Sequence, residues 1–388
     1  MSDTIENVLI LQGGGSLGAF GCGVFKALAS NNIKIDIVAG TSIGGVNAAI
    51  IAGGKQGEHP EKILEQYWLE LAEESTYNYR ESLLSLYAPL ANTKKLAHID
   101  QAKSTLSFYG SALHGNKKVF IPRWNPEYCF RDPQYFAPND WTYLYDHSPL
   151  VKTAEKYIDY NKLQPNGNPN ARLIITAVNV LTAEPLIFDT AKQEITSKHL
   201  LAATGYPTYY FPWIKVQEGV YAWDGSLLSN TPLREVIDAS PVKDKRIFLV
   251  ENYPKNIDRL PNNLQEVQHR ARDIMFSDKT MHSVQMSKTI TYYLRLINDL
   301  YKMLEEHFDP VESNNKEDKE KFADIQARYK KVSEEHGSEI KGVHYITRTE
   351  LYPSLYENAD FSLAAIRNSI EDGETKTNQV LKEISKKP

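Results

Sequence analysis

The sequence predicts a three-layer α/β/α fold with a mainly parallel central sheet, followed by a mainly helical C-terminal extension. Two apolar runs near the N-terminus, residues 8–11 and 35–39, have the pattern of strands buried on both faces. Each run ends in a glycine-rich turn, and apolar residues at helical spacing follow it. This beginning predicts parallel strands covered by helices on both sides, with ligands bound beyond the carboxyl ends of the strands. Later apolar runs predict strands at residues 173–178, 185–188, 220–223 and 246–250, the last being the final core strand.

Length and periodicity divide the chain of 388 residues into two parts. We expect an α/β domain over residues 1–260 and a mainly helical extension over 261–388. In the extension, an apolar stripe over 290–304 is interpreted as core, and the charged run 314–335 as a solvated helix face or a mobile segment. In the first part, residues 107–150 are rich in aromatic residues and prolines and lack a clear period. This insertion is interpreted mainly as a packed loop, while a wall of an apolar substrate groove and contact with a lipid surface stay open.

Composition excludes several classes of protein. A formal net charge of -5 and the lack of a long basic run argue against nucleic-acid binding. The two cysteines, Cys22 and Cys129, offer neither a disulfide framework nor metal-ligand spacing, and we expect no metal site. The N-terminus lacks a signal-peptide pattern, and the most apolar long window, residues 33–54, falls short of a membrane span. We therefore expect a cytoplasmic protein with at most peripheral membrane contact, in an oligomeric state that is open and includes a dimer.

The pentapeptide Gly40-Thr41-Ser42-Ile43-Gly44, between the second predicted strand and a helix, has the pattern of a nucleophile elbow. Such a turn is strained, and the strand and helix backbones pass so close together that Gly40 and Gly44 leave no room for side chains. Ser42 would stand at the start of the helix, where backbone amides and the helix dipole favour an oxyanion. Because short G-x-S-x-G matches also occur by chance, a buried connection with incidental glycines is the alternative.

Two further turns supply the other parts that ester hydrolysis through an acyl-enzyme needs, a base and amide donors. The candidate base is Asp224, which follows a short predicted strand and precedes Gly225, a residue that permits an unusual backbone angle. The candidate donors lie in the run Gly13-Gly14-Gly15 after the first strand, because glycine backbones can point several N–H groups into one concavity.

The three motifs, in this order and strand context, resemble those of the patatin-like phospholipase family. They are a G-x-G-x-x-G turn, a G-x-S-x-G elbow and a D-G-[GA] aspartate, which correspond here to Gly13 to Gly18, Gly40 to Gly44 and Asp224 to Ser226. The resemblance covers about residues 7–250. Two positions depart from the family pattern. Leu17 stands where members often carry Arg or Lys, so an anion-steering side chain is absent, and Ser226 replaces the usual Gly or Ala.

The resemblance implies an acyl-ester hydrolase that acts on lipids, of the phospholipase A or lysophospholipase type, without a cofactor. Catalysis would use a dyad of Ser42 and Asp224 without histidine. The implied oxyanion donors are the backbone amides of Gly13, Gly14, Gly15 and Ile43. A free aspartate, with a pKa of ~3.9, is a poor base for a hydroxyl, so a partly apolar pocket would have to raise its pKa.

Three alternatives stay open. The first turn also fits a dinucleotide fingerprint, for which Asp36 lies at about the right distance, so an oxidoreductase that uses NAD or FAD is the main competitor. A Ser-Asp-His triad would need a histidine after Asp224, and the chain offers His269, His282, His307, His336 and His344. All five are expected in the helical extension, away from any strand end. The third alternative is a non-catalytic lipid-binding protein of the same fold.

Overall fold

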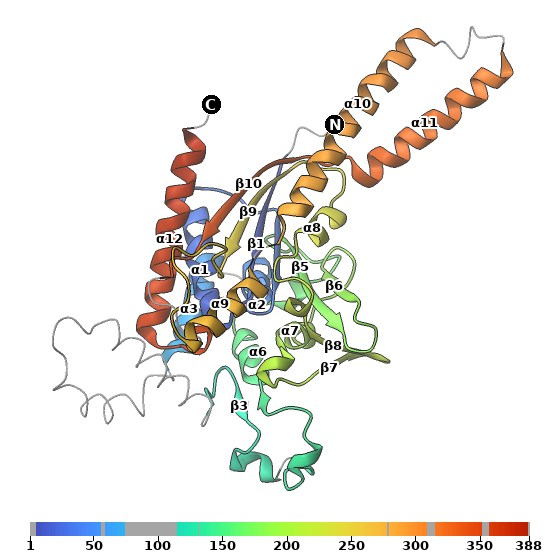
Figure 1. The fold of residues 1–388 in the computed structure, drawn as a ribbon. Helices are drawn as coiled ribbons and strands as arrows, with labels where there is room; N and C mark the ends of the chain where they lie inside the picture. The colour runs from blue at the N-terminus through green and yellow to red at the C-terminus, as the bar shows by residue number, and fades with distance from the viewer. Residues whose placement is uncertain are drawn as a thin grey trace.

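The computed structural model describes residues 5–55, 59–73, 115–130, 132–277, 279–308, 315–350 and 357–386. Figure 1 shows a central sheet with helices on both faces and two long helices that project from one end. The strands of this sheet are β1 (Glu6–Leu11), β2 (Ile37–Thr41), β5 (Arg172–Asn179), β6 (Pro185–Asp189), β7 (Ile214–Gln217), β8 (Val220–Asp224), β9 (Lys245–Glu251) and β10 (Ile340–Thr347). The predicted strands are therefore present, and the three-layer α/β/α prediction is confirmed.

The sheet is mainly parallel. Its strand order is β10-β9-β1-β2-β5-β8-β7, and β6 also pairs with β5. The pairs from β10 through β9, β1 and β2 to β5 are parallel, whereas β5 pairs with β6 and β8, and β8 with β7, in antiparallel fashion. A parallel sheet needs helical crossovers that cover both of its faces, and this explains why its central strands are apolar throughout.

Alternate side chains of β1 serve the two cores. Leu9 and Leu11 pack into the larger core, and Val8 and Ile10 into the smaller one. The helices that line the larger core are α1 (Ala19–Ser30), α2 (Ile43–Gly53), α3 (Pro60–Glu73), α6 (Ser148–Ala154), α7 (Ser197–Thr204) and α12 (Leu363–Ser385). The smaller core is closed by α8 (Leu233–Ala239) and the start of α10 (Met281–His307). Two further long helices in the described residues are α9 (Leu264–Phe276) and α11 (Lys316–His336).

The C-terminal extension is mainly helical, as predicted, but two of its elements complete the α/β body. Strand β10 adds a parallel edge strand beside β9, and α12 packs along α1. Gly23 of α1 and Gly373 of α12 make this close approach possible, because a Cβ atom at either position would collide with the backbone of the other helix. The prediction that β9 is the final strand of the core was wrong, and the domain boundary at residue 260 stays a prediction.

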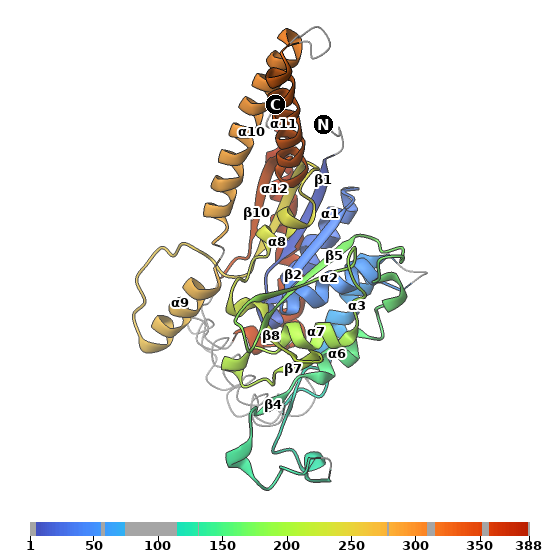
Figure 2. The same cartoon turned by 90° about the vertical axis from the view of Figure 1, so that its right-hand side faces the viewer.

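Helices α10 and α11 form an antiparallel pair that projects from the body (Figures 1 and 2). Tyr301 of α10 stacks on Tyr329 of α11, with ring centroids 4.2 Å apart. Most of the stripe predicted as core is nevertheless exposed, since Tyr293 and Leu300 are each 56% accessible, so that interpretation was wrong. Helix α11 has no buried residue, which confirms the predicted solvated helix in the charged run.

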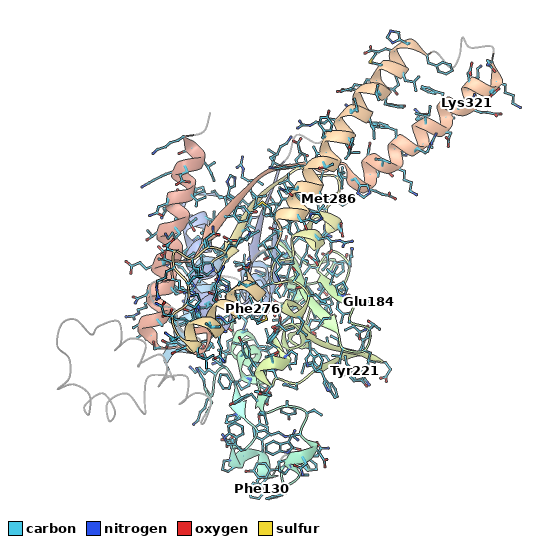
Figure 3. All side chains as sticks on the ribbon, in the orientation of Figure 1. Phe130, Glu184, Tyr221, Phe276, Met286 and Lys321 are labelled. Carbon is cyan, nitrogen blue, oxygen red and sulfur yellow. The ribbon has the colours of Figure 1, made fainter. Side chains whose placement is uncertain are left out.

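The aromatic insertion is packed at its base and exposed at its tip. Its first residues, 107–114, lie outside the described residues, and from residue 115 on it contains a short antiparallel pair, β3 (Ile121–Pro122) and β4 (Tyr145–Asp146). Phe120, Tyr145 and Phe211 pack edge to face at the base. Phe130 is 94% and Phe136 is 79% exposed, and Figure 3 shows Phe130 at the tip, the far end of the insertion. Tyr135 also packs against Trp141, so the packed-loop interpretation holds except for the exposed side chains of Phe130 and Phe136.

Candidate active site

Ser42 lies on a sharp turn between β2 and α2. Its backbone angles, φ 56° and ψ -131°, fall in a strained region that a residue with a side chain rarely adopts. A Cβ atom at Gly40 would collide with the backbone of Gly44, and one at Gly44 with the carbonyl oxygen of Leu11. The reason predicted for the two glycines, a close passage of strand and helix backbones, is confirmed.

The strand register brings Asp224 to the same edge of the sheet as Ser42. Thr41, which precedes the serine, pairs with Thr176 of β5, and the next residue of β5, Ala177, pairs with Asp224 of β8. The Thr41 and Thr176 hydroxyl oxygens lie 2.9 Å apart and link the two strands at this point. Two residues that are distant in the sequence therefore become neighbours across one intervening strand.

The Asp224 carboxyl is buried and surrounded by hydroxyl groups. Its side chain is 0% exposed, and Oδ1 accepts hydrogen bonds from the Ser226 amide at 2.9 Å and the Ser226 hydroxyl at 2.7 Å. Burial raises its pKa to about 6, against the opposing effects of the Ser42 hydroxyl and Ser226. Oδ2 accepts no hydrogen bond of ordinary geometry from the described residues. It is therefore the carboxyl oxygen that can accept a hydrogen bond from the Ser42 hydroxyl. Long catalytic hydrogen bonds are common in proteins without a bound substrate.

Gly225 is required for a different reason from the one predicted. It does not adopt a positive φ angle. Instead, a Cβ atom at this position would lie 2.6 Å from Thr176 Oγ1, so glycine lets the aspartate turn pack against β5. Ser226 fits the turn, and its hydroxyl adds a hydrogen bond that Gly or Ala could not supply.

The first glycine turn lies beside the serine. A Cβ atom at Gly13 would come within 2.7 Å of Ser42 Cβ, and Gly14 and Gly15 have φ angles of 150° and 59°, which favour glycine. The Gly13 amide donates to Asn230 Oδ1 at 2.9 Å, so it is already engaged. Within the described ranges, the amides of Gly14, Gly15 and Ile43 have no acceptor. The candidate oxyanion donors therefore narrow to these three.

Side chains that the sequence did not single out hold the turn in place. Asn252, after β9, donates through Nδ2 to the carbonyl oxygens of Gln12 and Gly13, each at 3.1 Å. The Gln12 side chain in turn accepts from the Asn252 amide at 2.9 Å and donates to Thr231 Oγ1 at 2.9 Å. No local motif marks these residues, because their role depends on contacts across more than 200 positions.

The histidines of the extension do not take part in this geometry. In the described part of the chain, none of the five interacts with Asp224, whose partners are Ser42 and Ser226. The expected position was wrong for His344, which lies within β10 against Phe248. His269 is buried in α9, where Nε2 lies 3.0 Å from Glu350. Burial opposes the charged form of His269, but hydrogen bonds to Glu350 and Glu357 raise its pKa to about 9.

In the described part of the chain, the cluster of side chains that could hold a metal ion lies outside this site. One ligand atom each from His269, Glu350 and Glu357 falls within 4.8 Å of the others, close enough for one cation. However, Arg272 and Arg348 donate to Glu357 Oε1 at 2.8 and 2.9 Å, and their positive charges oppose a metal ion. Metal-independent activity stays a prediction.

Asp36, the acidic residue that the dinucleotide alternative needs beside the glycine turn, lies at the other end of the sheet. Asp36 precedes β2, so it lies at the amino end of the sheet, whereas the glycine turn lies at the carboxyl end. Its Oδ2 already accepts from the Asn7 amide at 2.9 Å. A ribose that sits beside the glycine turn would not reach this carboxylate.

Fold and site together define a class of α/β proteins in which a strained serine and a buried carboxyl meet at the carboxyl edge of a mainly parallel sheet. A family model described as patatin-like phospholipase matches residues 9–237, more than half of the chain. The chain therefore belongs to the patatin-like phospholipase family, a family of lipid hydrolases.

Solved structures with some likeness to the chain include two bacterial proteins. VipD from Legionella pneumophila is 14% identical, with a TM-score of 0.40, over 98% of this chain and 67% of VipD. ExoU, in complex with SpcU from the type III secretion system of Pseudomonas aeruginosa, is 17% identical, with a TM-score of 0.24, over 70% of this chain and 49% of ExoU. A second structure of the type III effector ExoU is 12% identical, with a TM-score of 0.26, over 96% of this chain and 53% of that one. These low scores add nothing to the family assignment. No curated protein matches the chain.

Proposed function

We propose that this protein hydrolyses acyl esters of lipids, in the manner of a phospholipase A or a lysophospholipase, through a catalytic dyad of Ser42 and Asp224. The observation that carries the proposal is the pairing of a strained serine with a buried carboxyl whose pKa is raised to about 6. At neutral pH this carboxyl is ionised, and it is a stronger base than an ordinary aspartate.

In the proposed cycle, Ser42 Oγ attacks the ester carbonyl carbon while Asp224 takes its proton. The amides of Gly14, Gly15 and Ile43 donate hydrogen bonds to the oxyanion that develops on the carbonyl oxygen. Asp224 then returns the proton to the leaving alcohol, and the acyl group stays on Ser42. Water then attacks the acyl carbon while Asp224 takes its proton. The bond from the acyl carbon to Ser42 Oγ breaks, Asp224 gives the proton to Ser42 Oγ, and the fatty acid leaves. No step needs a cofactor.

The experiment compares hydrolysis of a short-chain p-nitrophenyl ester and of a phospholipid by the wild type, Ser42→Ala and Asp224→Asn. We expect Ser42→Ala to lower kcat by on the order of 10³ or more, and Asp224→Asn by on the order of 10²–10⁴. Ser30→Ala and Asp238→Asn are matched controls, because they make the same chemical changes at exposed side chains of α1 and α8. A fluorophosphonate probe should label Ser42 alone.

The outcome also separates the alternatives. Equal hydrolysis by the wild type and both dyad variants would favour a non-catalytic lipid-binding protein. A large loss on replacing any one of the five histidines would favour a triad, and complete loss in EDTA would contradict metal independence. Tight binding of NAD or FAD to the purified protein would revive the oxidoreductase.

For the lipid substrate, we propose peripheral membrane contact through the tip of the aromatic insertion. None of the helices in the described residues is both long and apolar enough to cross a bilayer. Figures 1 and 2 place the insertion at the end of the molecule opposite the projecting helices. The chain enters β1 at the end that carries the projecting helices α10 and α11. The carboxyl ends of the parallel strands therefore face the insertion. Exposed Phe130 and Phe136 would bury apolar area in the lipid interface.

The test is sedimentation with phosphatidylcholine vesicles. The double variant Phe130→Ser/Phe136→Ser should lose vesicle binding and keep activity on the soluble ester. Leu260→Ser is the matched control, because this side chain is 82% exposed on a different surface loop. Equal binding by the double variant and the wild type would exclude the tip as the contact.

A further inference from the structure

We propose that the short helical turn η9 (Glu357–Ala359) positions the glycine turn of the active site, and that Glu357 is the positioning residue that holds η9 there. The inference rests on the proposed function, because it concerns the oxyanion donors of Gly14 and Gly15. It assigns a catalytic consequence to a segment that lies far beyond residues 9–237, the part of the chain that the family model matches.

The glycine turn and η9 are in direct contact. A Cβ atom at Gly15 would collide with the carbonyl oxygen of Asn358, so no other residue fits at this position. Next to it, the Ser16 hydroxyl donates to the carbonyl oxygen of Glu357 at 2.7 Å. The backbone of η9 therefore forms one wall of the turn that carries the proposed donors.

A cluster of charged side chains fixes η9 in this place. Glu357 Oε1 accepts hydrogen bonds from Arg272 at 2.8 Å and from Arg348 at 2.9 Å. Arg272 also donates to Asn358 Oδ1 at 3.0 Å, so it holds two successive residues of η9. Arg272 comes from α9 and Arg348 follows β10, so the cluster ties η9 to two elements of the body. Phe276, at the end of α9 and labelled in Figure 3, packs against Tyr253, which follows β9, with ring centroids 5.2 Å apart.

The charge state of the cluster suits this role. Burial alone would raise the pKa of Glu357, but Arg348, His269 and Arg272 hold it below its ordinary value. The carboxylate is therefore ionised wherever Asp224 can act as a base. Hydrogen bonds between ionised partners are about twice as strong as neutral ones, and their fixed geometry restrains the backbone that carries them.

A glycine turn needs such support. Gly14 and Gly15 adopt φ angles that side chains disfavour, and glycine itself does not restrict them. Oxyanion donors act only when they are preorganised, and a misplacement of about 1 Å can lower a rate by on the order of 100-fold. A wall pressed against Gly15 restricts the turn at the position where the charge develops.

The experiment compares three full-length variants with the wild type. Glu357→Gln removes the charge that holds η9, and Ser16→Ala cuts the hydrogen bond between the turn and η9. Glu374→Gln is the matched control, because it makes the same chemical change in the C-terminal part of the chain. It removes an ion pair with Lys26, 2.6 Å long, between α12 and α1. For each variant we measure kcat and KM for p-nitrophenyl butyrate, the rate of Ser42 labelling by a fluorophosphonate, and the thermal midpoint.

The expected result is a fall in kcat and in labelling rate of about tenfold for Glu357→Gln and Ser16→Ala, with KM changed less than about twofold. Glu374→Gln should keep the wild-type kcat whatever its thermal midpoint, which separates positioning from stability. Should Glu357→Gln not fold, Ser16→Ala decides alone. Wild-type kcat in Ser16→Ala overturns the inference, and a raised kcat would make η9 a cover instead of a support. Hydrolysis that survives Ser42→Ala would refute the proposed function instead.

Discussion

The replacement Asp224→Asn should inactivate the protein and at the same time stabilise its fold. The carboxyl is fully buried, and its pKa is raised from 3.8 to about 6. The folded state binds this proton more tightly than the unfolded state does. The protein therefore loses stability as the pH rises from the pKa of the unfolded state to the pKa of the folded state. Above that window the buried carboxylate destabilises the wild type, and the neutral amide of Asn removes this penalty.

The size of the effect follows from the two pKa values. One pKa unit corresponds to about 1.4 kcal/mol, so a shift of about two units gives about 3 kcal/mol at pH 7.5. At pH 4.5 most of the folded carboxyl is protonated, and the difference falls to about 1 kcal/mol. Asn is close to isosteric with Asp and can still accept the hydrogen bonds of Ser226, so the volume of the site is unchanged.

The assay is urea denaturation of the wild type and Asp224→Asn at pH 4.5 and 7.5, with p-nitrophenyl ester hydrolysis measured on the same samples. We expect the variant to unfold at higher urea concentration at pH 7.5, with much of the gain lost at pH 4.5. A variant that is less stable than the wild type at pH 7.5, or a difference that does not depend on pH, would refute the reasoning. Retained hydrolysis would refute the role of Asp224 as the base.

Three further predictions concern the site and its surroundings. Because Asp224 must be ionised to act, kcat/KM should decrease as the pH falls below about 6. Ser226→Ala should move this decrease to higher pH, because it removes a hydrogen bond that lowers the pKa of Asp224. Gly44→Ala should lower the free energy of unfolding by more than about 3 kcal/mol, because its Cβ would meet a backbone oxygen, whereas Gly219→Ala, with open space but a φ of 71°, should cost about 1 kcal/mol; urea denaturation compares the two. The pKa of His269 is raised to about 9, so its protonated form stabilises the fold fully below about pH 6.5, and this stabilisation is lost as the pH rises through 9. The thermal midpoint of the wild type should therefore fall over this range more than that of His269→Gln.

Much of the site could be predicted from the sequence, because its parts are local. A strand, two close-packed glycines and a strained serine lie within a few consecutive residues. The steric demand at Gly40 comes from Gly44 within the same motif, although the demand at Gly44 comes from Leu11 of β1. The positions of the strands along the chain up to residue 250, and the parallel start, follow in the same way from apolar periodicity. Burial of Asp224 could be anticipated only as a requirement of the chemistry, since nothing in residues 220–226 shows what covers them.

The failures of prediction share one physical cause. The apolar stripe of α10 has the spacing of a core helix, but spacing does not specify whether a partner surface exists, and only part of the stripe meets α11. Strand β10 follows two long helices, so its pairing with β9 bridges almost a hundred residues. The Gly13 amide looked like a free donor, but Asn230, 217 positions away, occupies it.

The sequence by itself determined the serine elbow, the glycine turn, the aspartate turn and the α/β class, because each is marked by a short motif or by the apolar period of consecutive residues. Only the tertiary structure decided which amides remain free, how deeply Asp224 is buried, and that η9 lies against Gly15, a contact anchored by a hydrogen bond between residues 341 positions apart. Such long-range contacts depend on the sum of many weak packing energies over the whole chain, and no short pattern of residues records that sum.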